Sequence, residues 1–379
     1  MNRRELLQAL ALGGALAPGL TAAGPPAPAV PEAEERTVYL MGDDVPRSPE
    51  QWLARLTRTM KARPKVEDIY LRGGAVAELE QRFATLLGKD EALFLPTGTL
   101  ANQLAVRVLC GEHRRVLVPH ESHLYRDEND AAQLLGGINL VPLAPGRVGP
   151  TPDEVVAAVE QSLQPPFPVP VGALALESPV RRARGAMVDF ESARAISTYA
   201  RSKSIRLHLD GARLLLASAR PGFDVRAYAA LFDTVYVSLY KYLEAPFGAV
   251  LAGDKETIAR VRQLRHVFGG ALFQAWPAAV AALDALEGFP ERFRAAMAAA
   301  ERLFSALERA GGFKVQRVEN GTNLFTLELA PERQVGLAER LVKADVRLRA
   351  LKGNQCDLAV NETLLRQDPD ALVRAFLGR

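Results

Sequence analysis

Residues 205–210 read Ile-Arg-Leu-His-Leu-Asp, and residues 234–241 read Thr-Val-Tyr-Val-Ser-Leu-Tyr-Lys. In both stretches every second residue is apolar, which is the period of a strand that buries one face. A carboxylate, Asp210, arrives where the first strand ends, and an amine, Lys241, follows the second strand. Because open α/β sheets bind ligands at the carboxyl ends of their strands, we expect both side chains at one edge of one sheet.

Around these stretches, segments with the period of a strand alternate with segments that have the period of a helix, an order that predicts a mainly parallel α/β sheet. We expect strands at residues 92–95, 115–119, 138–143, 172–177, 205–209 and 234–239, and helices at residues 78–87, 101–109, 190–203, 255–265 and 276–286. After Pro290 a long Ala-rich helix leads to a smaller set of elements, with strands at residues 314–318 and 324–329 and near Val346 and Leu358, and a helix near residues 335–343.

Length and composition exclude several classes of protein. The chain has 379 residues, more than one compact domain usually contains, so two lobes with appendages are expected. A hydrophobic fraction of 48% with 24% charged residues is that of a packed globular protein, and a net charge of +3 gives no support for a nucleic-acid partner. The 2 cysteines allow at most one disulfide and no Cys-rich zinc site. The sequence has no uninterrupted apolar run long enough to predict a membrane-spanning helix.

Residues 1–31 are typical of an export leader followed by a Pro-rich linker. Arg3 and Arg4 precede a short apolar stretch at residues 9–20, and small residues follow at 21–24. This is the order of a secretory leader, and the arginine pair resembles a twin-arginine signal, although Asn2 and Gln8 depart from its usual flanks. We therefore expect a periplasmic protein, or a cytoplasmic one where the leader does not act.

The pairing of Asp210 with Lys241 meets the two needs of a pyridoxal cofactor: an amine that condenses with its aldehyde, and a carboxylate that keeps the pyridine nitrogen protonated. Taken alone, a strand-end Asp or Lys is more often a solvated loop residue or half of a salt bridge. Thr97-Gly98-Thr99, ahead of a helix, offers backbone N–H groups and a positive dipole end to a phosphate, but also serves as a plain helix cap. Of His120 and His123, one imidazole can lie over a flat ring, and the spacing does not choose between them.

Five segments together resemble the threonine aldolase and aromatic amino acid β-eliminating lyase family of pyridoxal-phosphate enzymes. The likeness runs in one order from about residue 67 to residue 286, and more faintly to the C-terminus; its most specific part is DGAR, then a strand, a lysine and APFG. The segments are FLPTGTLANQLA (94–105), HESHLYRDE (120–128), LHLDGARLLLAS (207–218), DTVYVSLYKYLEAPFGAVLAGD (233–254) and RQLRHVFGGALFQA (262–275).

The resemblance implies an aspartate-aminotransferase-like fold of type I, with a mainly parallel seven-stranded sheet in a large domain and a smaller C-terminal α/β domain. We place an N-terminal segment at residues 32–66, the large pyridoxal-phosphate-binding domain at 67–286 and the small domain at 287–379. Family members work as dimers or tetramers with active sites at subunit interfaces, so a homodimer or homotetramer is expected.

By motif position, the resemblance implies a role for each candidate residue and no metal. Lys241 would be the lysine that binds the cofactor, and Asp210 would pair with the pyridine nitrogen. Arg213 would lie near the cofactor's phenolic oxygen and the substrate. His123 would stack on the ring and act as acid or base. Phosphate would be held by the start of the helix, at Thr97, Gly98 and Thr99.

The chain also departs from the family pattern. Tyr240 and Tyr242 flank the lysine where Ser and Gly are usual, and no clear match to the family's N-terminal RSDT-type motif is found at residues 41–44. An arginine that helps to neutralise the phosphate is replaced by Phe273, and Trp276 stands two residues after Gln274 in place of a small residue. By a looser alignment, Asp357 stands where the family's arginine grips the substrate carboxylate. Since an anion does not clamp a carboxylate, the last change points to an altered substrate, or to Arg213 holding the carboxylate alone.

We therefore expect a threonine-aldolase-type lyase that cleaves the Cα–Cβ bond of a β-hydroxy-α-amino acid to glycine and an aldehyde. Two alternatives stay open at this point. One is another pyridoxal-phosphate reaction, β-elimination or transamination, on a different amino substrate. The other is a degenerate protein that binds the cofactor without catalysis, which the changes at Phe273 and Asp357 favour and the intact Lys241 and Asp210 oppose.

Overall fold

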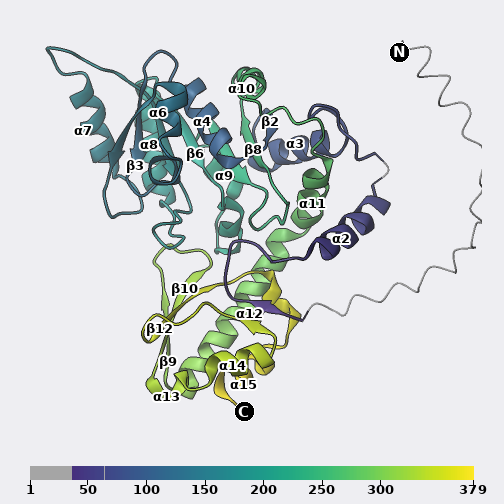
Figure 1. Ribbon diagram of the computed structural model, residues 1–379. Coiled ribbons are helices and arrows are strands. Elements are labelled where there is room, and N and C mark those ends of the chain that lie inside the picture. Colours follow the sequence, from purple (N-terminus) through teal and green to yellow (C-terminus); the bar gives the residue numbers. More distant parts are fainter. Residues whose placement is uncertain (1–35, 64) are drawn as a thin grey trace, which may run out of the picture. The chain divides into compact units, whose positions relative to one another are not determined.

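A seven-stranded sheet forms the centre of the larger lobe in the computed structural model, which describes residues 36–63 and 65–379 (Figure 1). The strand order is β2-β8-β7-β6-β5-β3-β4; the five strands from β7 to β4 are parallel, and β8 runs antiparallel to both of its neighbours. This confirms the expected mainly parallel seven-stranded sheet. Its strands are β2 (Glu91–Leu95), β3 (Arg115–Pro119), β4 (Asn139–Leu143), β5 (Val171–Glu177), β6 (Arg206–Asp210), β7 (Thr234–Ser238) and β8 (Ala249–Gly253).

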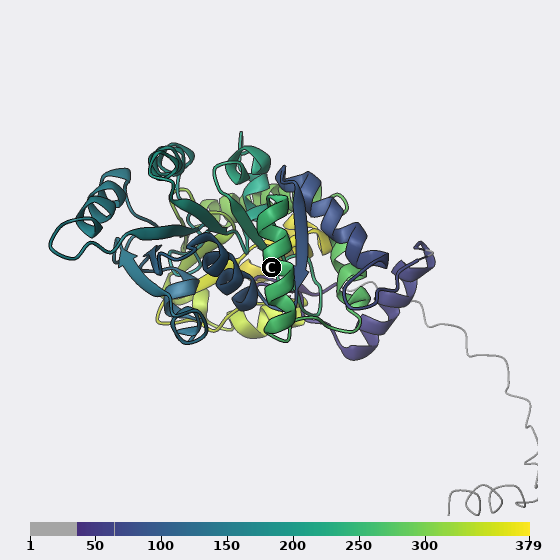
Figure 2. The same cartoon turned by 90° about the horizontal axis from the view of Figure 1, so that it is seen from above.

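Helices cover both faces of this sheet, as the view from above shows (Figure 2). Alternate residues of each strand feed two different apolar clusters: Phe94 of β2 packs into the largest cluster, whereas Leu93 and Leu95 pack on the opposite face. The face of Phe94 carries α3 (Gly74–Leu87), α7 (Pro152–Ser162), α8 (Phe190–Ser202), α9 (Val225–Ala229) and α11 (Trp276–Leu286). The other face carries α4 (Gly98–Leu109), α5 (His123–Arg126), α6 (Ala131–Gly136) and α10 (Lys255–Val267).

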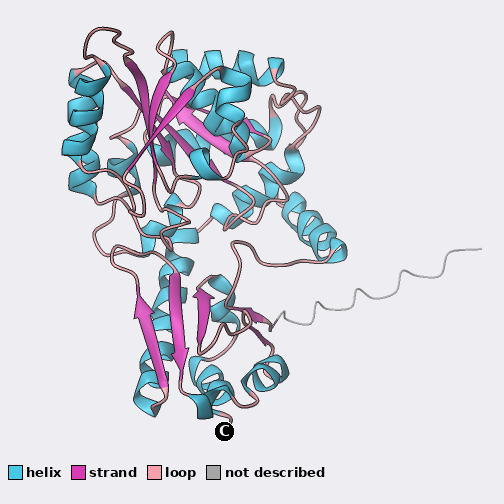
Figure 3. Ribbon diagram, turned by 60° about the vertical axis from the view of Figure 1, so that its left-hand side comes forward, coloured by secondary structure: helices cyan, strands magenta, loops and turns pink. Residues whose placement is uncertain are grey.

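The smaller lobe has its own cluster of buried apolar residues around a three-stranded antiparallel sheet, in the order β12-β10-β9 (Figure 3). Its strands are β9 (Phe313–Arg317), β10 (Leu324–Leu329) and β12 (Gln355–Ala359), and its helices are α12 (Phe289–Ala310), α13 (Pro331–Gln334), α14 (Leu337–Lys343) and α15 (Pro369–Leu377). Near the start of the described chain, β1 (Val38–Tyr39) pairs in parallel with β11 (Val346–Arg347). Two 3₁₀ turns, η1 (Leu214–Ala219) and η2 (Glu362–Arg366), complete the elements. The domain boundaries at residues 67 and 287 stay a prediction.

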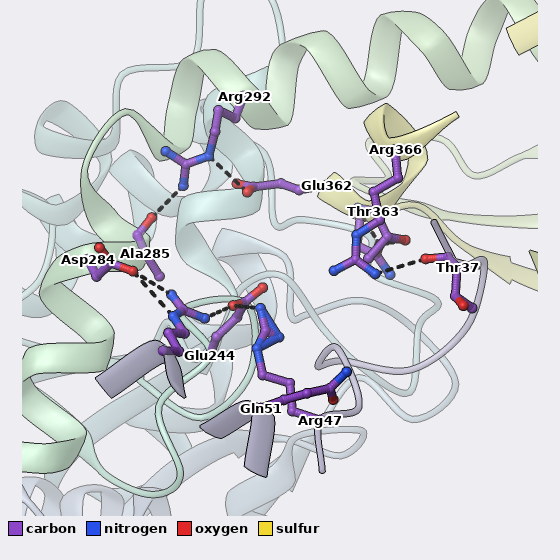
Figure 4. Close-up of polar contacts among 12 residues, drawn as sticks. Thr37, Arg47, Gln51, Glu244, Asp284, Ala285, Arg292, Glu362, Thr363 and Arg366 are labelled. Carbon is purple, nitrogen blue, oxygen red and sulfur yellow. Dashed lines mark hydrogen bonds and ion pairs between the residues drawn. The ribbon is translucent and has the colours of Figure 1, made fainter. Parts of the chain in front are cut away.

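Ion pairs and hydrogen bonds of charged side chains fix the chain on both sides of the segment that joins β1 to α2 (Pro49–Lys61) (Figure 4). Arg47 Nη2 donates to Glu244 Oε2 at 2.6 Å, and Arg55 also pairs with Glu244. Just before β1, Arg366 Nη1 donates to the Thr37 carbonyl at 2.9 Å. Since Glu244 lies three residues after Lys241, the bonds of Arg47 and Arg55 hold the start of α2 close to the loop that carries the lysine.

In the part of the chain that the structure describes, no helix combines the length and the apolar character that crossing a membrane requires. The same residues contain no cluster of three or more His, Cys, Asp or Glu arranged to hold a metal ion. Cys110 and Cys356 are both free thiols in buried positions. The leader and linker expected over residues 1–31 lie outside the described residues.

Candidate active site

Lys241 lies in the loop after β7, with its side chain buried. The pKa of its amine is lowered to about 8, first by burial and then by the positive charge of Arg213, while Asp210, Asp43 and Glu177 act in the opposite direction. A buried amine with a pKa near 8 is a nucleophile at neutral pH, whereas an ordinary lysine is almost wholly protonated there.

Asp210 ends β6, as the alternation of the strand predicts, and its side chain is buried. Its Oδ1 accepts a hydrogen bond from the backbone N–H of Ala212 at 3.1 Å, and its Oδ2 accepts one from Asn102 Nδ2 at 2.9 Å. The charge of Asp210 raises the pKa of both Lys241 and His123. The fold therefore brings the amine, the carboxylate and the imidazole into one electrostatic neighbourhood.

Of the two histidines that the spacing left open, His123 is the one coupled to this neighbourhood. Its Nδ1 lies 3.0 Å from Glu128 Oε1, and its backbone N–H donates to Glu177 Oε2 at 2.6 Å. The hydrogen bond to Glu128 is the largest cause of a raised His123 pKa. His120 instead bonds Glu121 at 2.8 Å and packs against the Tyr125 ring at 5.5 Å.

Behind these groups lies a buried polar network that the sequence analysis did not find. Asn102 Nδ2 also donates to Glu128 Oε1 at 2.8 Å, and Asn102 Oδ1 accepts from His208 Nε2 at 2.9 Å. His208 Nδ1 in turn lies 2.9 Å from Thr234 Oγ1, and complete burial lowers the His208 pKa to about 4, so the ring is neutral. A signal was present: in a strand, His208 and Asp210 face the same side.

Two further buried carboxyl groups complete the network. Burial is the largest cause of a raised pKa at Glu128 and at Glu177, and the negative charge of Asp210 adds to it in both cases. Glu177 ends β5, next to Asp210 in the parallel register, so the two carboxylates stand on neighbouring strand ends. The alternation of the expected strand at residues 172–177 placed Glu177 at that edge, but gave no reason to choose it.

Arg213 forms a two-bond ion pair with Asp43, which the sequence analysis did not select. Arg213 Nε donates to Asp43 Oδ1 at 3.0 Å, and a second bond joins Arg213 Nη2 to Asp43 Oδ2. Tyr242 Oη donates to Asp43 Oδ1 at 3.0 Å. Burial raises the pKa of Asp43, but the hydrogen bond and the charge of Arg213 outweigh burial, so the pKa is lowered overall. Tyr242, a departure from the family pattern, thus has a structural role.

The start of α4 is shaped to receive an anion. Thr97 is the N-cap residue, and its Oγ1 accepts the backbone N–H of Leu100 at 3.1 Å. A Cβ at Gly98 would lie 2.0 Å from Tyr236 Oη, so the chain passes too close to Tyr236 for any side chain there. Because the first N–H groups of a helix have no partner within the helix, Gly98 and Thr99 leave donors and a positive dipole end for a phosphate.

The remaining residues that depart from the family pattern lie in different surroundings. Phe273 is exposed and packs edge-to-face on the Tyr70 ring at 5.4 Å. Tyr240 is partly exposed, with its ring centre 5.4 Å from Lys241 Nζ. The backbone N–H of Trp276 donates to Asp68 Oδ1 at 2.8 Å. Asp357 pairs with Arg184 at 3.1 Å on the wall of a cavity that also touches Arg213.

These residues fit pyridoxal phosphate as a set. A buried amine suits its aldehyde, a carboxylate suits its ring nitrogen, an imidazole suits its flat ring, and a helix start suits its phosphate. The chemistry of the donors requires all four in one place, and the charge of Asp210 raises the pKa of both Lys241 and His123.

Comparison with known proteins gives a family match over residues 54–330, to the beta-eliminating lyases. The low specificity L-threonine aldolase of Escherichia coli K12 is 28% identical over 296 residues, which cover 78% of this chain and 86% of that protein. Alanine racemase TOXG of Cochliobolus carbonum is 30% identical over 281 residues, 69% of each chain. A solved structure from Exiguobacterium sp. 255-15, of a protein proposed to be an aromatic amino acid beta-eliminating lyase/threonine aldolase, covers 91% of this chain and 96% of its own with TM-score 0.76 and 27% identity.

Proposed function

Since the chain belongs to the beta-eliminating lyase family and is a pyridoxal-phosphate-dependent lyase of the threonine-aldolase type, we propose that it cleaves the Cα–Cβ bond of a β-hydroxy-α-amino acid, giving glycine and an aldehyde. The observation that carries the proposal is the convergence of Lys241, Asp210 and His123, with Glu128 behind the imidazole. Aldol cleavage needs a group that removes the β-hydroxyl proton, and His123 is placed to do so.

Pyridoxal phosphate, when bound, supplies a ring that accepts the electron pair of the broken bond. The residues of the chain prepare this step. Lys241 offers its amine, and Asp210 keeps a negative charge where a ring nitrogen needs a proton. His123 Nδ1 is bound to Glu128, so the Nε2 end of the imidazole is left to take the β-hydroxyl proton. Arg213, held in one orientation by Asp43, offers a guanidinium to the substrate carboxylate.

The test is product analysis with the purified holoenzyme. Threonine, allo-threonine and phenylserine are assayed for glycine, β-substituted alanines and serine for pyruvate, and L-alanine for the D-isomer, because one relative is an alanine racemase. Glycine release that disappears in Lys241→Ala supports the proposal. If the protein shows the visible absorbance of bound cofactor but releases pyruvate, the aldol reaction is replaced by another pyridoxal-phosphate reaction. If it shows that absorbance and releases no product at all, it binds the cofactor without catalysis.

We also propose that the chain works as a homodimer or homotetramer. Three large apolar side chains, Ile69, Tyr70 and Phe273, are each more than half exposed, and the Tyr70 and Phe273 rings pack together. Exposed apolar groups of this size are typical of a contact surface. Size-exclusion chromatography of the holoenzyme with light-scattering detection gives the mass directly. A monomer at micromolar concentration contradicts the proposal.

For the compartment we propose the periplasm, on the leader pattern of residues 1–31. A twin-arginine route carries folded proteins, so it suits a cofactor that is loaded before export. Fractionation of the full-length chain with a C-terminal tag tests this. A shortened form in the periplasmic fraction that is lost in Arg3→Lys/Arg4→Lys supports export, and an uncleaved protein confined to the cytoplasm contradicts it.

A further inference from the structure

A cavity of about 230 Å³ lies between the two lobes, and the Arg213–Asp43 ion pair forms part of its wall. The opposite wall comes from β10 and β12 of the smaller lobe, and a third side from the loop after β5. The charged side chains of the wall are four arginines and two aspartates: Arg181, Arg184, Arg213, Arg349, Asp43 and Asp357.

The charges of this arginine-lined cavity do not balance. Asp43 pairs with Arg213, and Asp357 pairs with Arg184 at 3.1 Å. For the guanidinium groups of Arg181 and Arg349, the described residues supply no carboxylate within ion-pair distance. The cavity therefore holds two positive charges in excess. The α-carboxylate of an amino-acid substrate accounts for one of them at most.

The cavity is also tied to the proposed reaction centre. The backbone N–H of Arg181 donates to Glu177 Oε1 at 2.8 Å, and the other oxygen of the same carboxylate accepts the backbone N–H of His123. One buried carboxylate thus sets the distance between the arginine loop and the imidazole. Glu177 therefore links the loop of Arg181 directly to the residue proposed to act on the β-hydroxyl group.

We propose that the arginine-lined cavity is a subsite for a second anionic group, a carboxylate or a phosphate, carried by the substrate beyond its β-carbon. This inference rests on the proposed aldol cleavage. For 3-hydroxyaspartate the reaction balances: the Cα–Cβ bond breaks, the β-hydroxyl loses its proton as its carbon becomes a carbonyl, and Cα gains one proton. The products are glycine and glyoxylate.

Asp357 allows a test in which a substitution should strengthen binding of the second acid. A general loss of structure would weaken that binding instead. Asp357 neutralises Arg184 and adds a negative charge to the cavity wall. Removing that charge in Asp357→Asn strengthens the attraction for a second acid, whereas removing a positive charge in Arg349→Gln or Arg181→Gln weakens it. The Asp357 side chain is half exposed, and Arg181 and Arg349 are exposed, so all three substitutions are compatible with folding.

The binding test compares matched ligands on the holoenzyme by calorimetry. Aspartate is compared with asparagine, and phosphoserine with serine, so that each pair differs in one anionic group, a carboxylate in one arm and a phosphate of about −2 charge in the other. We expect at least one acid to bind roughly tenfold more tightly than its neutral partner, as for a charge-assisted bond near a surface. Arg349→Gln and Arg181→Gln reduce this ratio, Asp357→Asn raises it, and Arg309→Gln, on the outer surface of α12, leaves it unchanged.

Glycine release from 3-hydroxyaspartate and from threonine separates this inference from the proposed function. Equal affinity for charged and neutral partners in both arms, with threonine cleaved, overturns the subsite and leaves the aldolase. A preference for acids that follows the variants as stated, without glycine from any substrate, supports the subsite and overturns the aldolase. A preference unchanged in the arginine variants assigns the second acid to another place and overturns the proposal.

Discussion

Asn102 Nδ2 lies 2.9 Å from Asp210 Oδ2, so the carboxylate at the end of β6 is held by a side chain of α4. The same nitrogen lies 2.8 Å from Glu128 Oε1, the group that binds His123. One amide therefore orients both the carboxylate proposed for the ring nitrogen and the carboxylate behind the imidazole. Because His208 bonds the oxygen of this amide at 2.9 Å, the amide is held with its nitrogen toward the carboxylates.

We expect Asn102→Leu to lower kcat/KM by roughly 10- to 100-fold, because a hydrogen bond to a charged group contributes about 1.5–3 kcal/mol. Without this donor the Asp210 carboxylate is less firmly oriented toward the ring nitrogen, which shifts the pH titration of the holoenzyme's visible absorbance. Thr234→Val, which removes only the far end of the same network at His208, is the graded control and should change both readouts less. An unchanged titration in Asn102→Leu contradicts a positioning role.

Glu128→Gln should lower the pKa of His123, because the bond to Glu128 is the largest cause of its raised value. With only 5 histidines in the chain, the imidazole signals of ¹³C-labelled protein can be followed through a pH titration, and His123→Gln assigns the signal. As a proton acceptor, His123 must be neutral, so the acidic limb of the rate profile moves to lower pH in Glu128→Gln. A His123 pKa that stays above 6.5 in this variant shows that another charge maintains it.

Gly98→Ala should destabilise the fold and weaken cofactor binding together, because the new Cβ would lie 2.0 Å from Tyr236 Oη. Tyr236 is buried, so the start of α4 must move, at a cost of about 1–3 kcal/mol for an overpacked site. Gly136→Ala, where the nearest atom is the flexible end of Ile138 at 3.0 Å, is the matched control. Thermal unfolding and the Kd for pyridoxal phosphate are the two measurements, and equal values for both variants contradict the close approach.

The strand ends show how far the sequence determines this site. Period-two alternation predicts where β6 and β7 end, and the places of Asp210 and Lys241 follow from that alone. The spacing of His120 and His123 did not separate them, because the choice depends on Glu128 and Glu177, which reach His123 only through tertiary contacts. Asp43 was missed for the same reason: its partner Arg213 is 170 residues away. β8 was missed because its residues, Ala249–Gly253, are without charged or polar side chains and buried on both faces, which gives no alternation.

The buried amine of Lys241 makes the stability of the apoprotein depend on pH. In the unfolded chain a lysine has a pKa near 10.5, and in the fold burial lowers that of Lys241 to about 8. The unfolded state therefore binds more protons between these values, and stability rises with pH through this window. Below pH 8 the full cost of burying the charged Lys241 amine lowers the free energy of unfolding, by about 3 kcal/mol. Above pH 10.5 this cost is absent.

Lys241→Met, which keeps the length of the side chain without the charge, should therefore be more stable than the wild-type apoprotein at pH 7. The gap between their free energies of unfolding should shrink from pH 8 upward and level off only above pH 10.5. Denaturant titrations at three pH values measure it, and Lys203→Met, at an exposed position after α8, controls for the loss of one positive charge. A constant gap across the window means that Lys241 is not desolvated in the apoprotein, and its reactivity at neutral pH then needs another cause.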